Sequence, residues 1–231
     1  MVLNKSSILN NFHYYTYGKI PRLLVHSGTH GDEYEIIDIV ADALERYKAD
    51  LPSFIFVPRV SPSAVELRTR ENTNGYDLNR QFKTDSTELE VLENLKIVER
   101  GPFDLFVTFH EDPLCTAYYM YDVGSDELDR TYVVENNATL QKHGIELYSG
   151  VDDPLDENLN HEFVNGYKKF AHNAIVEEDG MISTWALNKK LAKDCWIPEV
   201  PGRASIETKK FLVDNIFKNL ILEYFKRNNH E

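Results

Sequence analysis

The sequence predicts an α/β fold, in which helices pack against the faces of a sheet, and three observations support this. Short apolar runs alternate along the chain with longer amphipathic stretches. The chain has 231 residues, of which 42% are hydrophobic and 12% aromatic, so it can bury a sizeable core. It contains neither an internal repeat nor a linker-like segment. We therefore expect one domain over residues 1–231.

The first half of the chain alternates between predicted strands and a helix. Leu23-Leu24-Val25 reads as a buried strand that runs into the turn-prone residues 27–31. Residues 36–47 place their apolar side chains at helical spacing, with polar side chains between them. Three further apolar runs predict strands, at residues 54–57, 105–109 and 118–121.

The second half adds two helices and one strand. Residues 128–142 predict a helix that Gly144 ends, and the acidic, turn-rich residues 152–158 predict a solvated loop, with an acidic metal clamp as the alternative. Trp196-Ile197 predicts a short strand broken by Pro198 and closed by Pro201-Gly202. A long helix follows Ser205, its predicted N-cap, over about 206–226. Its predicted apolar face contains Phe211, Leu212, Ile216, Phe217, Leu220 and Tyr224.

Composition excludes several classes of protein. The chain carries 38 acidic and 25 basic residues, a formal charge of −13, which argues against nucleic-acid binding. No run of 18 apolar residues is present, so we expect no membrane span. The first ten residues lack an apolar stretch of signal-peptide length, and only Cys115 and Cys195 are cysteines. Two cysteines cannot form a disulfide framework, so we expect a cytoplasmic protein.

Two segments contain potential metal ligands. His30 and Glu33 lie three residues apart between a strand and a helix, so they share one face of the first helical turn and are able to bind one Zn²⁺. The alternative is a surface histidine beside a carboxylate that complements the helix dipole. His110 follows an apolar strand, where α/β sheets collect their ligand sites, although a structural histidine is the commoner case. His26 lies within its strand and reads as a core or supporting histidine.

Two further segments contain groups suited to substrate binding and acid–base catalysis. Residues 70–82 hold two arginines and three asparagines around one glycine, which suits carboxylate recognition, with a polar surface loop as the alternative. Glu199 lies in an apolar, proline-flanked strand end, where desolvation raises the pKa of a carboxylate toward that of a general base. The alternative is an ordinary strand-end glutamate paired with Arg203.

In this order, the four segments resemble the zinc carboxypeptidase family, and most closely its compact bacterial murein-peptide amidases and related carboxypeptidases. That branch has a pattern like R-x-N-x-N-G-x-D-L-N-R-x-F, which residues 70–82 match at every fixed position. Ser183-Thr184-Trp185-Ala186, ahead of Glu199, is similar to the family's specificity stretch. The resemblance spans residues 22–222 and implies a three-layer α/β/α sandwich with a mixed, mostly parallel central sheet.

The resemblance also implies a role for each residue. His30, Glu33 and His110 would bind one Zn²⁺, although such a set also accepts other divalent ions. Asp77 would orient the His30 imidazole, Arg70 would stabilise the oxyanion, and Glu199 would act as the general base. The substrate-binding residues would be Asn79 and Arg80, for a terminal carboxylate, and Ser183 or Thr184, for the terminal side chain.

The leading functional hypothesis is therefore a zinc-dependent carboxypeptidase or peptide amidase that acts on a small peptide, with a cell-wall peptide as one candidate. An N-acyl amino acid deacylase of the aspartoacylase or succinylglutamate desuccinylase type shares most of the motifs and is the nearest alternative. A noncatalytic peptide- or metal-binding module is the third hypothesis. The chain departs from the family in one respect, because residues 175–177 lack its mobile tyrosine, for which Tyr167 is a potential substitute.

Overall fold

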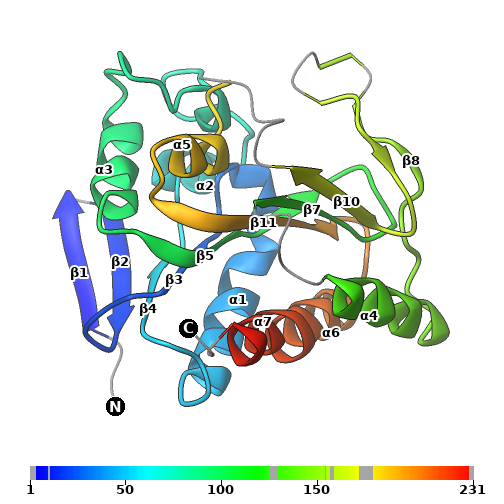
Figure 1. The fold of residues 1–231 in the computed structure, drawn as a ribbon. Coiled ribbons are helices and arrows are strands. Elements are labelled where there is room, and N and C mark those ends of the chain that lie inside the picture. The colour runs from blue at the N-terminus through cyan, green and yellow to red at the C-terminus, as the bar shows by residue number, and fades with distance from the viewer. Residues whose placement is uncertain are drawn as a thin grey trace.

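The computed structural model describes residues 4–9, 11–124, 130–153, 155–156, 159–171 and 179–228 (Figure 1). In these residues, nine strands form one mixed sheet in the order β1-β2-β4-β3-β5-β11-β7-β10, with β6 paired to β11. The strands are β1 (Asn4–Leu9), β2 (Phe12–Tyr17), β3 (Leu23–His26), β4 (Phe54–Val57), β5 (Phe103–Thr108), β6 (His110–Asp112), β7 (Tyr119–Gly124), β10 (Tyr167–Ala171) and β11 (Ala192–Pro201). A separate two-stranded sheet pairs β8 (Gly150–Val151) with β9 (Glu162–Phe163).

Most strand pairs of the large sheet are parallel. β3 pairs in parallel with β4 and β5, β11 with β5 and β6, and β7 with β10. The pairs β1–β2, β2–β4 and β7–β11 are antiparallel. This confirms the predicted mixed, mostly parallel sheet.

Helices cover both faces of this sheet, as the alternation of its side chains requires. In β3, Leu23 and Val25 enter one buried cluster and Leu24 enters the other. The first cluster is covered by α1 (Glu35–Tyr47), α4 (Thr131–Lys142), α6 (Ile206–Asn215), a π-helical segment (Ile216–Ile221) and α7 (Leu222–Arg227). On the other face lie α3 (Leu89–Val98) and α5 (Ile182–Asn188), as Figure 1 shows. The three-layer α/β/α architecture is confirmed.

Strand β11 differs from its prediction, because it runs through Pro198 for ten residues. On one side, its partner changes from β5 at Trp196 to β6 at Glu199. On the other side, Pro198 lies opposite Met120, whose N–H is directed away to Gly166. Between Trp196 and Glu199, β11 therefore has no strand partner on the side of β5 and β6, because β5 ends at Thr108 and β6 begins at His110. The missing N–H of Pro198 falls at this gap, so the proline does not end the strand.

The predicted helices agree with the structure in position and differ in detail. Ser205 caps α6 by accepting a hydrogen bond from the Thr208 N–H, as predicted. Phe211 does not join the predicted apolar face and is 41% exposed. The described part of the 128–142 helix begins at Thr131, and Leu128 lies outside the described residues. None of the described helices combines the length and apolar character needed to cross a membrane.

Candidate metal centre and substrate cavity

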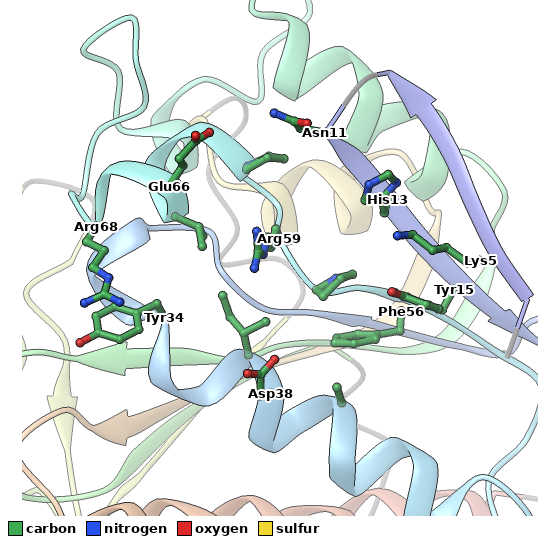
Figure 2. A pocket seen from close by; sticks show the side chains of 15 residues that line it. Lys5, Asn11, His13, Tyr15, Tyr34, Asp38, Phe56, Arg59, Glu66 and Arg68 are labelled. Atoms are coloured by element: carbon green, nitrogen blue, oxygen red, sulfur yellow. The ribbon is translucent and has the colours of Figure 1, made fainter.

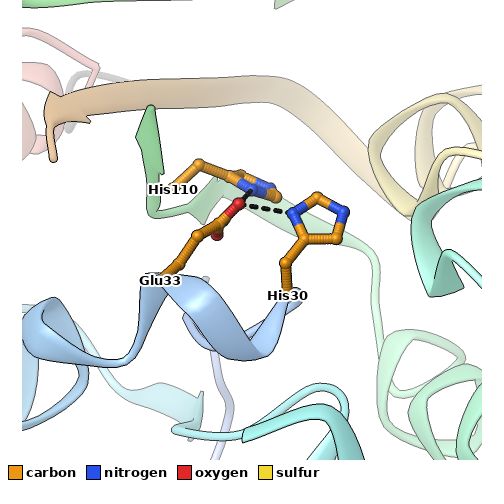
Figure 3. Close-up of side chains that lie close together, drawn as sticks. All are labelled: His30, Glu33 and His110. Carbon is orange, nitrogen blue, oxygen red and sulfur yellow. Dashed lines mark hydrogen bonds and ion pairs between the residues drawn. The ribbon is translucent and has the colours of Figure 1, made fainter. Parts of the chain in front are cut away.

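Two strand ends bring three potential metal ligands together. The chain leaves β3 at His26, passes His30 and enters the short helix η1 (Gly31–Glu33), while His110 begins β6. His30, Glu33 and His110 are all buried, and one ligand atom from each lies within 4.8 Å of the others (Figure 3). The sequence prediction therefore selected three residues that do converge.

The imidazoles face Glu33 through their Nδ1 atoms. His30 Nδ1 contacts Glu33 Oε1, and His110 Nδ1 lies 2.9 Å from Glu33 Oε2. Each Nε2 atom forms a hydrogen bond on the side of the ring away from Glu33. His30 Nε2 lies 3.1 Å from Asp77 Oδ1, and His110 Nε2 lies 3.3 Å from Thr108 Oγ1. A partner on the distal nitrogen fixes the orientation of a metal-binding imidazole.

The donor set is suitable for a divalent cation. Burial opposes ionisation of Glu33, but His110 and His30 outweigh it and lower the Glu33 pKa to about 2. Burial lowers the His30 pKa, but Glu33 and Asp77 together raise it to about 9, so a metal ion would bind this imidazole by displacing its proton. An ionised carboxylate and two imidazole nitrogens in a buried site fit Zn²⁺, and they also fit other divalent transition metals.

Gly31 makes the tight packing of η1 possible. Helix α2 (Pro62–Leu67) packs against η1, and a Cβ atom at Gly31 would lie 1.7 Å from the Ala64 carbonyl oxygen. The Gly31 N–H donates to the Thr69 carbonyl at 2.7 Å. Any larger residue would separate η1 from α2 and displace His30 and Glu33, which explains a glycine between them.

Glu199 lies beside the three potential ligands. In β11 it is the register partner of His110 on one side and of Tyr119 on the other. Withdrawal from bulk water raises its pKa to about 7; His110 acts in the opposite sense, and Glu33 and Asp112 add to the increase. A carboxyl group that titrates near neutral pH is suited to exchange protons with a substrate.

Asp77 connects the metal ligands to Arg70. Its Oδ2 atom accepts hydrogen bonds from Arg70 Nε at 3.1 Å and Nη2 at 2.8 Å, while its Oδ1 atom faces His30. Burial would raise the Asp77 pKa, but His30 and the nearby arginines hold it well below its usual value. Arg70 is 45% exposed at its side chain and so remains accessible to a ligand.

The predicted substrate-binding residues lie at the junction of η2 (Leu78–Arg80) and α5. Asn79 Oδ1 accepts a hydrogen bond from the Ile182 N–H at 3.2 Å, which joins the two segments. Thr184 donates its hydroxyl to Asp179 at 2.7 Å, and Ser183 lies beside it. The Arg80 guanidinium donates to the Asp156 carboxylate at 2.5 Å.

All ten predicted site residues line one cavity of about 970 Å³. Several other lining residues had no role assigned from the sequence, namely Thr108, Tyr119, Tyr121, Asp152, Asp156, His161 and Asp179. Tyr119 donates to Asp112 at 2.9 Å, and Tyr121 donates to Asp152 at 2.7 Å. The alternation of β7 was the available signal, because it directs Tyr119 and Tyr121 to the same face.

The acidic segment is a loop that borders this cavity, and its exposure agrees with its interpretation as a solvated loop, since Asp153 is exposed and Leu155 is 95% exposed. Asp152 binds Tyr121 and the His161 N–H, and Asp156 binds Arg80. Among the described residues, the group of side chains that could hold a metal ion does not include these carboxylates, so the alternative of an acidic metal clamp gains no support. Residues 154, 157 and 158 lie outside the described part of the chain, as do residues 175–177.

Two other residues do not line this cavity. Tyr167 donates to Asp122, on the opposite face of β7 from Tyr121, and does not line the cavity. It therefore does not replace a mobile tyrosine in this structure. His26 is fully buried edge-on against Phe106, and burial lowers its pKa to about 3. The prediction of a core histidine is correct.

Comparison with solved structures finds the same fold. No protein-family model and no curated protein sequence matches the chain. A proposed metallopeptidase from Shewanella amazonensis superposes with a TM-score of 0.73 at 17% identity, over 95% of this chain and 86% of that one. The murein-tripeptide amidase of Escherichia coli O157 gives a TM-score of 0.53 at 18% identity, over 89% and 86%.

A metallo-carboxypeptidase from Pseudomonas aeruginosa, solved with (2-guanidinoethylmercapto)succinic acid, gives a TM-score of 0.62 at 15% identity. The match covers 92% of this chain and 60% of that one. At such low identities, the comparisons establish the architecture. The chain therefore has the fold of the metallopeptidases and metallocarboxypeptidases, which confirms at the level of the fold its resemblance to the zinc carboxypeptidase family.

Proposed function

We propose that this chain is a metal-dependent hydrolase that removes the C-terminal residue of a small peptide. One observation carries the proposal: His30, Glu33 and His110 converge in a cavity that Glu199 also lines. A metal site with only a structural role does not require a carboxyl group of raised pKa beside its ligands. Hydrolysis by water requires such a group as a general base.

The metal ion would be held by the two Nδ1 atoms and the Glu33 carboxylate. Zinc is the expected ion, and other divalent ions suit the same donors. Such an ion, when bound, polarises a carbonyl group and lowers the pKa of water toward about 7. Asp77 and Thr108 would keep the two imidazoles in their binding orientation.

The protein's own groups would manage the proton and the developing charge. Glu199 would take a proton from the attacking water and deliver it to the leaving nitrogen, which its raised pKa favours. Arg70, held in place by Asp77, would donate hydrogen bonds to the oxyanion that forms on the scissile carbonyl.

The substrate's terminus would bind between η2 and α5. Asn79 and Arg80 would hold the terminal carboxylate, so that this carboxylate takes the place of Asp156 on the guanidinium. Ser183 and Thr184 would contact the side chain of the released residue. The names of two similar structures support a peptide substrate, one a carboxypeptidase and the other a murein-tripeptide amidase. We further propose that residues 1–231 act as one catalytic domain in the cytoplasm.

A comparative hydrolysis assay tests this function. Purified protein loaded with Zn²⁺ is incubated with peptides that have free C-termini and, separately, with N-acyl amino acids. We expect release of the C-terminal residue from peptides, and a loss of about 10²–10⁴-fold in kcat for Glu199→Gln without loss of metal. Preferential cleavage of N-acyl amino acids would assign a deacylase instead. Stoichiometric metal with no hydrolysis of either class would assign a noncatalytic binding module.

A further inference from the structure

A second cavity, of about 930 Å³, lies between the β1–β2 hairpin and helices α1 and α2 (Figure 2). It shares no lining residue with the cavity that contains the potential metal ligands. Arg68 and Tyr34 border one end, Lys5 and Tyr15 border the other, and Arg59 lies between them, as Figure 2 shows. We call this cavity the Arg59 groove.

The Arg59 groove gathers cations in a protein of formal charge −13. Across the described residues, Lys5 and Arg59 form no ion pair with a carboxylate, and the Arg68 guanidinium lies 4.3 Å from the centre of the Tyr34 ring. Most other arginines of the molecule contact carboxylates, including Arg22, Arg70, Arg80 and Arg130. Unneutralised cations that face one concave surface create a local positive potential suited to anions.

The state of His13 is consistent with that potential. Burial lowers the pKa of His13, and the positive charges of Lys5 and Arg59 lower it further. Its Nδ1 atom is buried and has no hydrogen-bond partner among the described residues. Two carboxylates, those of Asp38 and Glu66, also border the groove, and the resulting balance of formal charge is positive.

One wall of the groove is apolar. Tyr15 stacks on the buried Phe56 with the ring centroids 6.2 Å apart, and the half-buried Pro58 and Ala41 continue this surface. A bare inorganic anion would use the cations but leave this wall uncovered. A ligand with an apolar or planar body attached to its acidic groups would use both.

We propose that the Arg59 groove binds a small molecule that carries two or more phosphoryl or carboxylate groups on an apolar or planar body. Arg59 and Lys5 bind the acidic groups, and Tyr15 and Pro58 pack against the body. The site is separate from the proposed hydrolytic centre and does not depend on it.

Calorimetric titration of the metal-free full chain tests this site, with tripolyphosphate, citrate and adenosine triphosphate as three separate probes. We expect saturable binding of at least one probe. Binding of tripolyphosphate or adenosine triphosphate would indicate a site for phosphoryl groups, and binding of citrate would indicate a site for carboxylates. Tighter binding of adenosine triphosphate than of tripolyphosphate would support contact with the aromatic wall, and equal binding would contradict that part of the proposal.

Variants locate the site. Arg59→Gln should weaken binding by about tenfold or more, because it removes a charged hydrogen-bond donor. Lys142→Gln, which removes an exposed charge on α4, and Arg80→Ala, in the other cavity, should leave binding unchanged. Ligand saturation should also raise the pKa of His13, measured by NMR. The proposal is overturned if no probe saturates, if Arg59→Gln has no effect, or if Arg80→Ala abolishes binding.

Discussion

At the scale of single residues, charge pairing determines which groups are available to a substrate. Arg80 is the predicted anchor for a carboxylate, yet a carboxylate of the protein, Asp156, contacts it. Arg70 is likewise paired with Asp77, but Asp77 supports His30 from the same position and need not move. A substrate carboxylate that binds Arg80 must therefore displace Asp156, and this exchange reduces its net affinity.

Removing this competition should improve binding. We expect Asp156→Asn to lower KM for peptides with a free C-terminus by roughly fivefold, the equivalent of about 1 kcal/mol for a partly exposed ion pair. Steady-state kinetics of the purified variant measure the change. Asp153→Asn, on the same acidic segment, is the matched control for the loss of charge. An unchanged KM in Asp156→Asn would mean that Arg80 does not hold the substrate carboxylate.

The sequence identified the residues of the site that belong to motifs, but not those that only folding brings near. His30, Glu33 and residues 70–82 are recognisable from local spacing. Asp156 contacts Arg80 across 76 positions of the chain, and no local pattern encodes that pairing. Thr108 was accessible in principle, because it lies two residues before His110 in an extended segment and so on the same face.

At the scale of elements, a buried lysine joins three of them next to the potential metal ligands. Lys209 of α6 is 1% exposed and donates to Glu35 at the start of α1 and to Glu111 of β6, the latter at 2.6 Å. Glu111 also accepts from the Glu35 N–H at 3.2 Å. Because Glu33 precedes α1 and His110 begins β6, Lys209 stabilises the relative position of both potential ligands.

Replacing this lysine with an apolar residue should destabilise the protein and loosen the metal site. Lys209→Met leaves Glu111 buried without its cation, and we expect a loss of about 3 kcal/mol in the free energy of unfolding, with weaker metal binding. Denaturant unfolding and metal titration measure the two effects. Lys210→Met, an exposed neighbour, should change neither. Wild-type stability in Lys209→Met would show that the three elements do not depend on this pairing.

The elements themselves were predicted better than their ends. Periodicity located α1 and the strands around it because amphipathic patterns are local. The continuation of β11 through Pro198 depends on which strands lie on either side, and only the tertiary structure supplies that information. Phe211 has the correct spacing for the apolar face of α6, yet it is exposed, and the spacing alone gives no sign of this.

At the scale of the whole molecule, the negative charge opposes the proposed substrate. The chain has a formal charge of −13, and several carboxylates line the proposed substrate cavity, among them Asp112, Asp152, Asp156 and Asp179. An anionic peptide therefore approaches against a repulsive potential, and among the described residues that line the cavity, Arg70 and Arg80 would oppose it locally together with a bound metal ion.

This repulsion should depend on salt. The screening length falls from about 30 Å at 0.01 M to about 8 Å at 0.15 M ionic strength. We expect kcat/KM for an anionic peptide to rise by about threefold over this range, while a cationic peptide with the same cleaved bond shows a decrease. Measurement of kcat/KM for both peptides at each ionic strength gives the answer. Parallel responses of the two would contradict electrostatic control of association.

The α/β class followed from the alternation of apolar runs with an amphipathic helix, such as residues 36–47 after 23–25. The strand order did not follow, because β11 inserts between β5 and β7 after a long separation in the chain. Such pairings are set by burial of both faces of the sheet, which the local periodicity of the sequence does not describe. The family resemblance supplied the expectation of a mixed, mostly parallel sheet.

The proposed hydrolysis requires that His30, Glu33 and His110 hold one metal ion, and elemental analysis of the purified protein measures this. After loading with Zn²⁺ and removal of excess metal, we expect the wild-type chain to retain a single equivalent. His110→Ala should lose it while keeping its fold, judged by circular dichroism. A wild-type chain that retains no divalent metal, or a folded His110→Ala variant that retains as much as wild type, would contradict the account.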